Sequence, residues 1–104
     1  MEWLEPWCSV YQSEERFKES WNKQLQIELS PGHVLYGVPV KLIARGNGDD
    51  ALFEFLDGSG RVADVHLTWE KGPEKAPLPG TAIYASLEHW AQEVMIPENQ
   101  EWES

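Results

Sequence analysis

Residues 51–69 have the sequence ALFEFLDGSGRVADVHLTW, in which two alternating apolar runs flank a glycine-rich connection. Side chains of a strand point alternately to the two faces of a sheet, so each run predicts a strand with one apolar face. We therefore expect a β-hairpin with strands at 51–56 and 61–69. Its faces match if Phe55 pairs with Ala63 and Phe53 with Val65. This register leaves Gly58-Ser59-Gly60 as a three-residue loop.

A helix is predicted before this hairpin, over residues 13–29. Ser13 is suited to cap its first turn, where Glu14 and Glu15 interact favourably with the helix dipole. Four apolar residues recur at every fourth position and form one stripe: Phe17, Trp21, Leu25 and Leu29. The helix ends at Ser30-Pro31-Gly32, because proline cannot continue it.

The segments between and after these elements are also assigned from pattern. Residues 33–37 form a short β-like run, and residues 40–45 form a strand. The turn sequence GNGDD follows this strand at 46–50. Residues 70–80 are rich in proline and glycine and form an irregular connection. Ser86 caps a second amphipathic helix, over residues 87–95, and Pro97 ends it.

These elements predict one α+β domain over residues 1–104. We expect a three- or four-stranded antiparallel meander with an N-terminal and a C-terminal helix, and a length of 104 residues suits a single core. Residues 1–12 are expected to form an apolar arm that packs back on the domain. Residues 98–104 are expected to form a mobile acidic tail.

The net charge of −10 limits the classes of partner. Nucleic acids and anionic membranes are recognised through clustered Lys and Arg, so neither is expected to bind. Residues 76–104 contain five Glu and no Lys or Arg, which favours a basic protein as partner. The single cysteine and the absence of a basic, apolar signal sequence at the N-terminus favour the cytoplasm.

One group of residues could carry chemistry. In the predicted register Glu54 lies across from Asp64, with His66 further along the same strand. Two carboxylates opposite each other repel unless a cation or a shared proton relieves them. The functional interpretation is a divalent-metal site or an acid–base pair. The alternative is a solvated sheet face, on which Lys41 or Arg45 of the neighbouring strand relieves the repulsion.

Tryptophan supplies the candidates for a partner surface. Six Trp in 104 residues is a high proportion, and aromatic residues are enriched at interfaces. Trp3, Trp7 and Trp102 lie outside the predicted regular elements, and Glu98 and Glu101 are acidic residues near Trp102. We interpret these five as candidates for partner binding. For Trp3 and Trp7, an equal alternative is that they pack the N-terminal arm onto the domain.

Several motifs together resemble those of a group of small bacterial cytoplasmic proteins of uncharacterised activity. They are SPGHVLYG at 30–37, DDALF at 49–53, VHLTW at 65–69 and SLEHW at 86–90. The resemblance covers residues 25–101 and implies a bacterial cytoplasmic origin, but no activity, cofactor or catalytic residue.

The sequence contains no phosphate-binding loop, dinucleotide fingerprint or nucleophile elbow. We therefore expect no catalytic residue and no cofactor, and a non-catalytic domain that binds another protein. An inhibitor or immunity-type protein with a basic partner is its most specific form. The alternatives are a small enzyme or divalent-metal binder that uses Glu54, Asp64 and His66, and an accessory domain.

Overall fold

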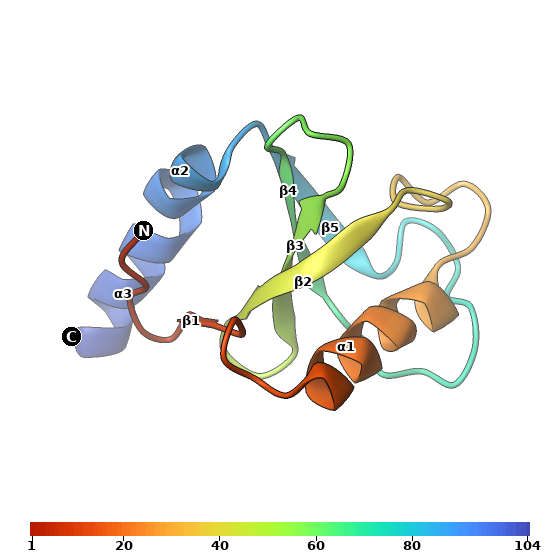
Figure 1. The fold of residues 1–104 in the computed structure, drawn as a ribbon, viewed down its shortest axis with the longest axis horizontal. Coiled ribbons are helices and arrows are strands. Elements are labelled where there is room, and N and C mark those ends of the chain that lie inside the picture. Colours follow the sequence, from red (N-terminus) through yellow and green to blue (C-terminus); the bar gives the residue numbers. More distant parts are fainter.

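The computed structural model describes residues 1–104 and contains one antiparallel sheet of five strands in the order β1-β2-β3-β4-β5 (Figure 1). The strands are β1 (Cys8–Ser9), β2 (Val40–Arg45), β3 (Asp50–Phe55), β4 (Val62–His66) and β5 (Gly80–Tyr84). The helices are α1 (Glu15–Glu28), α2 (Leu87–Trp90) and α3 (Ile96–Glu103), with a π-helical turn at Ala91–Met95 between the last two. The predicted α+β class and the two terminal helices are confirmed, but the strand count is five.

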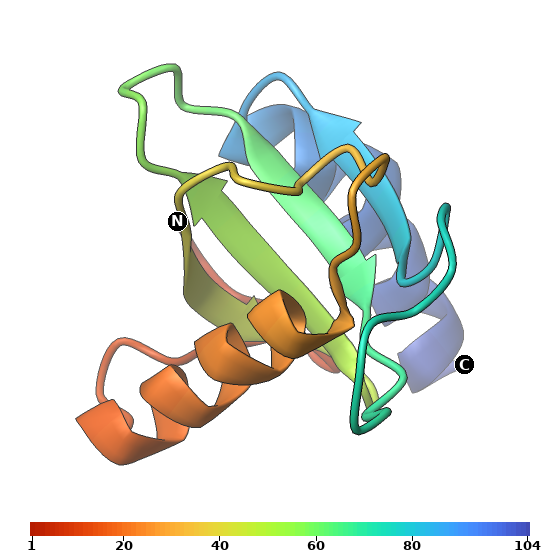
Figure 2. The ribbon, with the colours of Figure 1, turned by 90° about the vertical axis from the view of Figure 1, so that its right-hand side faces the viewer.

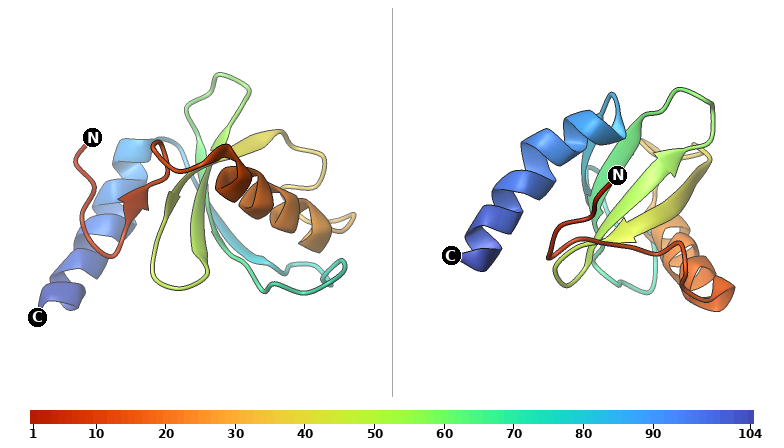
Figure 3. Two further views of the ribbon diagram at one scale, coloured as in Figure 1. Left: turned by 60° about the horizontal axis from the view of Figure 1, so that its bottom comes forward. Right: turned by 60° about the vertical axis from the view of Figure 1, so that its left-hand side comes forward.

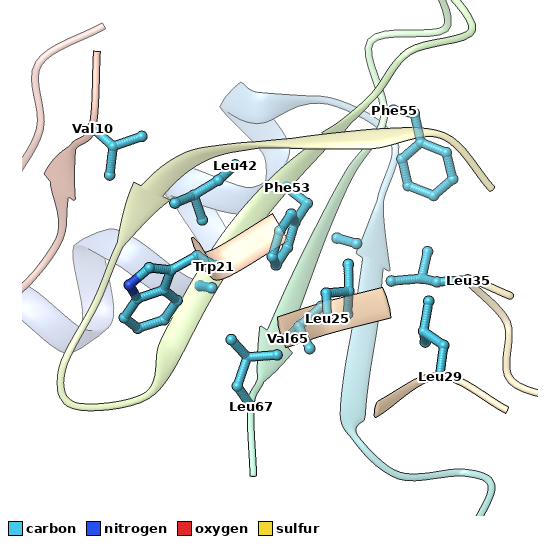
Figure 4. Close-up of a cluster of buried hydrophobic side chains, with 12 residues drawn as sticks. Val10, Trp21, Leu25, Leu29, Leu35, Leu42, Phe53, Phe55, Val65 and Leu67 are labelled. Atoms are coloured by element: carbon cyan, nitrogen blue, oxygen red, sulfur yellow. The ribbon is translucent and has the colours of Figure 1, made fainter. Parts of the chain in front are cut away.

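The helix α1 covers one face of the sheet (Figure 2). Its apolar stripe packs on side chains of β2, β3 and β4, as Figure 4 shows for the largest of them. The buried cluster consists of Val10, Trp21, Leu25, Leu29, Leu35, Leu42, Ala51, Phe53, Phe55, Ala63, Val65 and Leu67. The predicted stripe is thus confirmed. The predicted cap is wrong, because the helix begins at Glu15 and no side chain caps its first turn.

The opposite face of the sheet is covered as well, by the N-terminal arm and the C-terminal helix (Figure 3). This second buried cluster consists of Trp7, Ala44, Leu52, Val62, Trp90, Ala91 and Met95. The arm lies beside the C-terminal helix, and β1 pairs with the end of β2. The alternative interpretation of this face as solvated is therefore wrong for most of its centre, which is buried.

The register of the β3–β4 hairpin differs from the prediction by two residues. Phe53 pairs with Ala63, so the predicted faces are kept while every partner changes. The connection is longer than predicted, and Asp57 closes it by accepting hydrogen bonds from the Ser59 N–H at 2.9 Å and from Arg61 at 3.0 Å. Hydrogen bonding by the Ser59 side chain, then by the Ser59 N–H and Arg61, lowers the pKa of Asp57 to about 2. The hydrogen bonds of Asp57 thus stabilise the longer loop over the three-residue loop that we predicted.

The C-terminal helix continues past the point where we expected it to stop. Pro97 lies in the first turn of α3, where its missing N–H breaks no bond, and the preceding π-helical turn bonds the Ile96 N–H to the Ala91 carbonyl. Residues 98–103, expected to be a tail, therefore form most of α3. Ser86 caps α2 as predicted, because its side chain accepts the His89 N–H.

Two further differences concern segments without a strong pattern. Residues 33–37, expected to be β-like, form successive turns in which the His33, Tyr36 and Val38 N–H groups bond to carbonyls three residues earlier. The strand β5 was missed, because residues 80–84 do not alternate between apolar and polar. No helix of the structure has the length and apolarity that a membrane crossing requires.

Candidate functional site

The residues predicted as a chemical site lie on the sheet face covered by the C-terminal helix, but they do not form one group. Glu54 pairs with Val62, whereas Asp64 lies opposite Leu52. The predicted Glu54–Asp64 pair is therefore wrong, because the hairpin register is shifted by two residues. Glu54 instead lies 3.6 Å from the ammonium of Lys41 on β2. Lys41 is one of the two cations that the alternative interpretation named, although in this register Glu54 faces no carboxylate of Asp64.

Asp64 occupies the boundary of the second buried cluster. Its Oδ2 accepts the indole N–H of Trp90 at 2.9 Å. Burial raises the pKa of Asp64 to about 6, and the Trp90 hydrogen bond opposes that rise. The carboxylates of Asp50 and Glu98 add to it. Burial and the nearby Asp64 charge also raise the pKa of Tyr84. Asp64 is thus a structural partner of Trp90.

His66 is exposed and pairs with a residue that we had assigned to a turn. Its Nδ1 lies 2.8 Å from Oδ1 of Asp50, and the two residues are directly opposite in the β3–β4 register. This hydrogen bond raises the pKa of His66. No three His, Cys, Asp or Glu side chains in the structure are grouped as metal ligands are. The geometry therefore does not assemble the predicted site.

One candidate tryptophan, Trp7, belongs to the second buried cluster, and a second, Trp3, packs against it. Trp7 is 2% exposed and meets the Trp90 ring edge-on, with centroids 4.8 Å apart. Its Nε1 donates to Oε2 of Glu98 at 2.7 Å. Trp3 is half-buried, with its ring 5.8 Å from that of Trp90. The interpretation of Trp7 as a partner-binding residue is therefore wrong, because the closing arm buries it.

The other three candidates lie together at the edge of a surface hollow. This acidic hollow has a volume of about 330 Å³ and is lined by Pro6, Asn47, Asp50, Glu98, Glu101 and Trp102. Trp102 is 50% exposed, and its Nε1 donates to Oε2 of Glu5 at 3.3 Å. The Asn99 amide donates to the Glu5 carbonyl at 2.7 Å, which fixes the arm against α3. The hollow thus joins the N-terminal arm, the β2–β3 turn and α3.

The lining of the acidic hollow is suited to a cationic side chain. It has three carboxylates and no Lys or Arg. Carboxylates bind guanidinium and ammonium groups through charge-assisted hydrogen bonds, and an indole face attracts the same cations. One oxygen of Glu98 is occupied by Trp7, whereas Glu101 is exposed. Asp50 is the lining carboxylate that sequence reasoning missed, because nothing in its turn sequence indicates the C-terminal helix beside it.

Sequence reasoning also missed Glu28, whose role is structural. Glu28 is fully buried and lies on the helix stripe of Trp21 and Leu25. Its spacing, three residues after Leu25, was the signal that could have revealed it. His33 is also buried: its Nδ1 accepts the Leu35 N–H at 2.9 Å, and its Nε2 lies 2.9 Å from the Pro79 carbonyl. His33 thus joins two loops.

Comparison with protein-family models, curated proteins and solved structures gives no match to this chain. We therefore infer its function from the geometry described above. The likeness to small bacterial proteins noted in the sequence stays an expectation.

Proposed function

We propose that the protein is a non-catalytic domain that binds a basic protein, and that the acidic hollow receives an Arg or Lys side chain of that partner. The observation that carries this proposal is the convergence of Asp50, Glu98, Glu101 and half-exposed Trp102 on one hollow without a basic residue. Glu98, Glu101 and Trp102 lie on α3, whereas Asp50 is far from them in the sequence, so the fold is what brings Asp50 to the hollow.

The electrostatics of the hollow favour a cation. Carboxylates that share a small, partly shielded space repel one another, and an incoming guanidinium removes that repulsion. Stacking on Trp102 adds about 0.5–1 kcal/mol at an exposed site. The net charge of −10 steers a basic partner at long range and accelerates association at low salt.

The specific form that we propose is an inhibitor or immunity-type protein in the bacterial cytoplasm. Such a protein needs a rigid surface that complements a basic partner, and it needs no catalytic group. The single cysteine, Cys8, is free and exposed, which suits a reducing compartment. The structure offers no observation that favours the enzyme or metal-binding alternative, because Glu54, Asp64 and His66 have separate partners.

The proposal is tested with a labelled arginine-rich peptide as the probe and fluorescence anisotropy as the readout. We expect saturable binding that weakens steeply between low and high salt, because screening shortens the range of the field. Glu101→Gln removes an exposed carboxylate of the hollow and is expected to weaken binding about fivefold. Glu103→Gln is the matched control, because Glu103 is exposed on the same helix but does not line the hollow.

Two results would contradict the proposal. Binding that is insensitive to salt would show that the charge of the hollow does not attract the peptide. Equal losses in the Glu101 and Glu103 variants would show that net charge alone matters and that the hollow is not the site.

A further inference from the structure

The outer edge of β5 is open. The Phe55 N–H bonds to the Arg61 carbonyl, which shows that Arg61 and every second residue after it direct their backbone groups to β3. The alternate residues of β4 therefore bond to β5, where their partners are Gly80, Ala82 and Tyr84. The backbone N–H and C=O groups of Thr81 and Ile83, between them, consequently point away from the sheet.

This edge lacks the protection that the other edge of the sheet has. At the β1 side the edge strand has only two residues, and Oδ1 of Asn22 accepts the Leu42 N–H at 3.2 Å. β5 has five residues, with no proline, no charged side chain and no register shift against β4. Ile83 of β5 is an apolar side chain that is 37% exposed, and Leu78, just before the strand, is 45% exposed. Such an edge is a template for another strand.

We propose that a second copy of this chain pairs with β5 in antiparallel fashion, with the two-fold axis at Ala82. The outward backbone groups of Thr81 in each copy then face those of Ile83 in the other copy. The two-fold axis makes these two pairs equivalent. Each pair exchanges two N–H···O=C bonds, so four backbone hydrogen bonds form and no outward group of these residues is left unpaired. An isologous two-fold contact is the commonest form of homodimer.

The side chains of β5 suit this register. Ala82, the residue on the axis, is small enough to lie against its own copy. Ile83 lies opposite Thr81 of the other copy on one face, and Tyr84 lies opposite Gly80 on the other, so a large side chain faces a smaller one in each pair. Residues 76–87 contain no charged residue, so no like charges come into register at the contact.

This inference is independent of the acidic hollow. An uncharged strand has no electrostatic preference for a basic partner, whereas its pattern of outward groups complements itself. Two chains of net charge −10 repel at long range, so added salt is expected to strengthen the dimer. The same salt weakens binding at the hollow, and the two proposals can therefore fail separately.

The first test measures the mass of the pure protein by sedimentation equilibrium at increasing concentration and salt. We expect the mass to rise from 11.9 kDa towards twice that value, and to do so at lower concentration when the salt is higher. A protein that stays at 11.9 kDa under all conditions would overturn the proposal and would leave β5 to an extended segment of another protein.

The second test fixes the register with cysteine pairs in a Cys8→Ser background. Ala82→Cys puts the two cysteines directly opposite each other, with Cβ atoms about 4.5–5.5 Å apart, close to disulfide geometry. Ile83→Cys puts them on a diagonal, about 7–8 Å apart and out of reach. We expect mild oxidation to cross-link the first variant and not the second. Equal cross-linking of both, or of neither, would refute the register.

A charge variant tests the same contact without cross-linking. Ala82→Lys places two ammonium groups opposite each other at the axis, on an exposed position where the monomer fold tolerates lysine. We expect the dimer dissociation constant to rise about fivefold or more. Ser9→Lys on β1 is the control, since it adds the same charge to an exposed position of the opposite edge strand. An equal effect of the two variants would contradict the proposed contact.

Discussion

Replacement of Glu28 by glutamine is expected to destabilise the fold strongly, although it changes only one atom of the side chain. The Glu28 carboxylate is fully buried at the end of α1. It accepts hydrogen bonds from the N–H and hydroxyl of Thr68 at 2.8 and 2.9 Å, from the Trp69 N–H at 2.9 Å and from the Gln24 amide at 2.8 Å. It therefore holds the start of the β4–β5 connection, where Trp69 adopts a left-handed φ of 60°.

The magnitude follows from the number of donors that glutamine can satisfy. Its single carbonyl oxygen can keep the two bonds to Thr68, but its amide nitrogen then faces two donors, the Trp69 N–H and the Gln24 amide. The Gln24 amide keeps its bond to the Glu70 carbonyl, whereas the Trp69 N–H has no other acceptor. One backbone donor loses its partner, and the bonds that remain lose the charge that strengthened them. A buried unpaired donor costs about 1–3 kcal/mol, so we expect a total loss of about 2–4 kcal/mol in the free energy of unfolding.

The assay is equilibrium unfolding in urea, followed by tryptophan fluorescence and by circular dichroism. We expect a lower midpoint at an unchanged slope, together with a melting temperature lower by about 8–32 °C, since about 4–8 °C corresponds to 1 kcal/mol in a domain of this size. Glu19→Gln is the matched control, because it makes the same change at an exposed position of α1. Equal midpoints for the two variants would refute the assigned role of Glu28.

Two further predictions concern the second buried cluster. The pKa of Asp64 is about 6, above its ordinary value of 3.8, so its ionisation lowers stability as the pH rises from about 4 to 6. Asp64→Asn is therefore expected to stabilise the protein by about 1–2 kcal/mol at pH 8 and not at pH 4 in thermal melts, and a gain that is independent of pH would contradict this. A Cβ at Gly46 would lie 2.8 Å from the Trp7 ring, so Gly46→Ala is expected to cost about 1–3 kcal/mol. Gly72→Ala, which meets nothing within 4 Å, should be neutral by the same melts, and equal effects would refute the close approach.

Periodicity predicted the parts of the fold that depend on local pattern. The stripe of α1 and the strand at 40–45 were identified because their apolar spacing matches one type of element. The hairpin faces were also correct. Its register was not, because a shift of two residues keeps every side chain on the same face, and only the hydrogen bonds of Asp57 distinguish the two arrangements.

The candidate site was less accessible to sequence reasoning, because it depends on contacts between distant segments. Glu101 and Trp102 were identified from charge and from their place outside the predicted elements. Their neighbours Pro6 and Asp50 join them only because the arm and α3 pack on the second face of the sheet. The π-helical turn before Pro97 makes that packing possible, and a proline alone favoured the opposite expectation.

The most direct test of the proposed binding site is a ¹H–¹⁵N spectrum recorded while the arginine-rich peptide is added. The indole N–H of Trp102 gives its own signal, which Trp102→Phe assigns. We predict that this signal and the Glu101 amide shift in a saturable way at low salt, while the indole of Trp21, which is buried on the other face of the sheet, stays in place. No shift at Trp102, or shifts confined to residues outside the acidic hollow, would contradict the proposal.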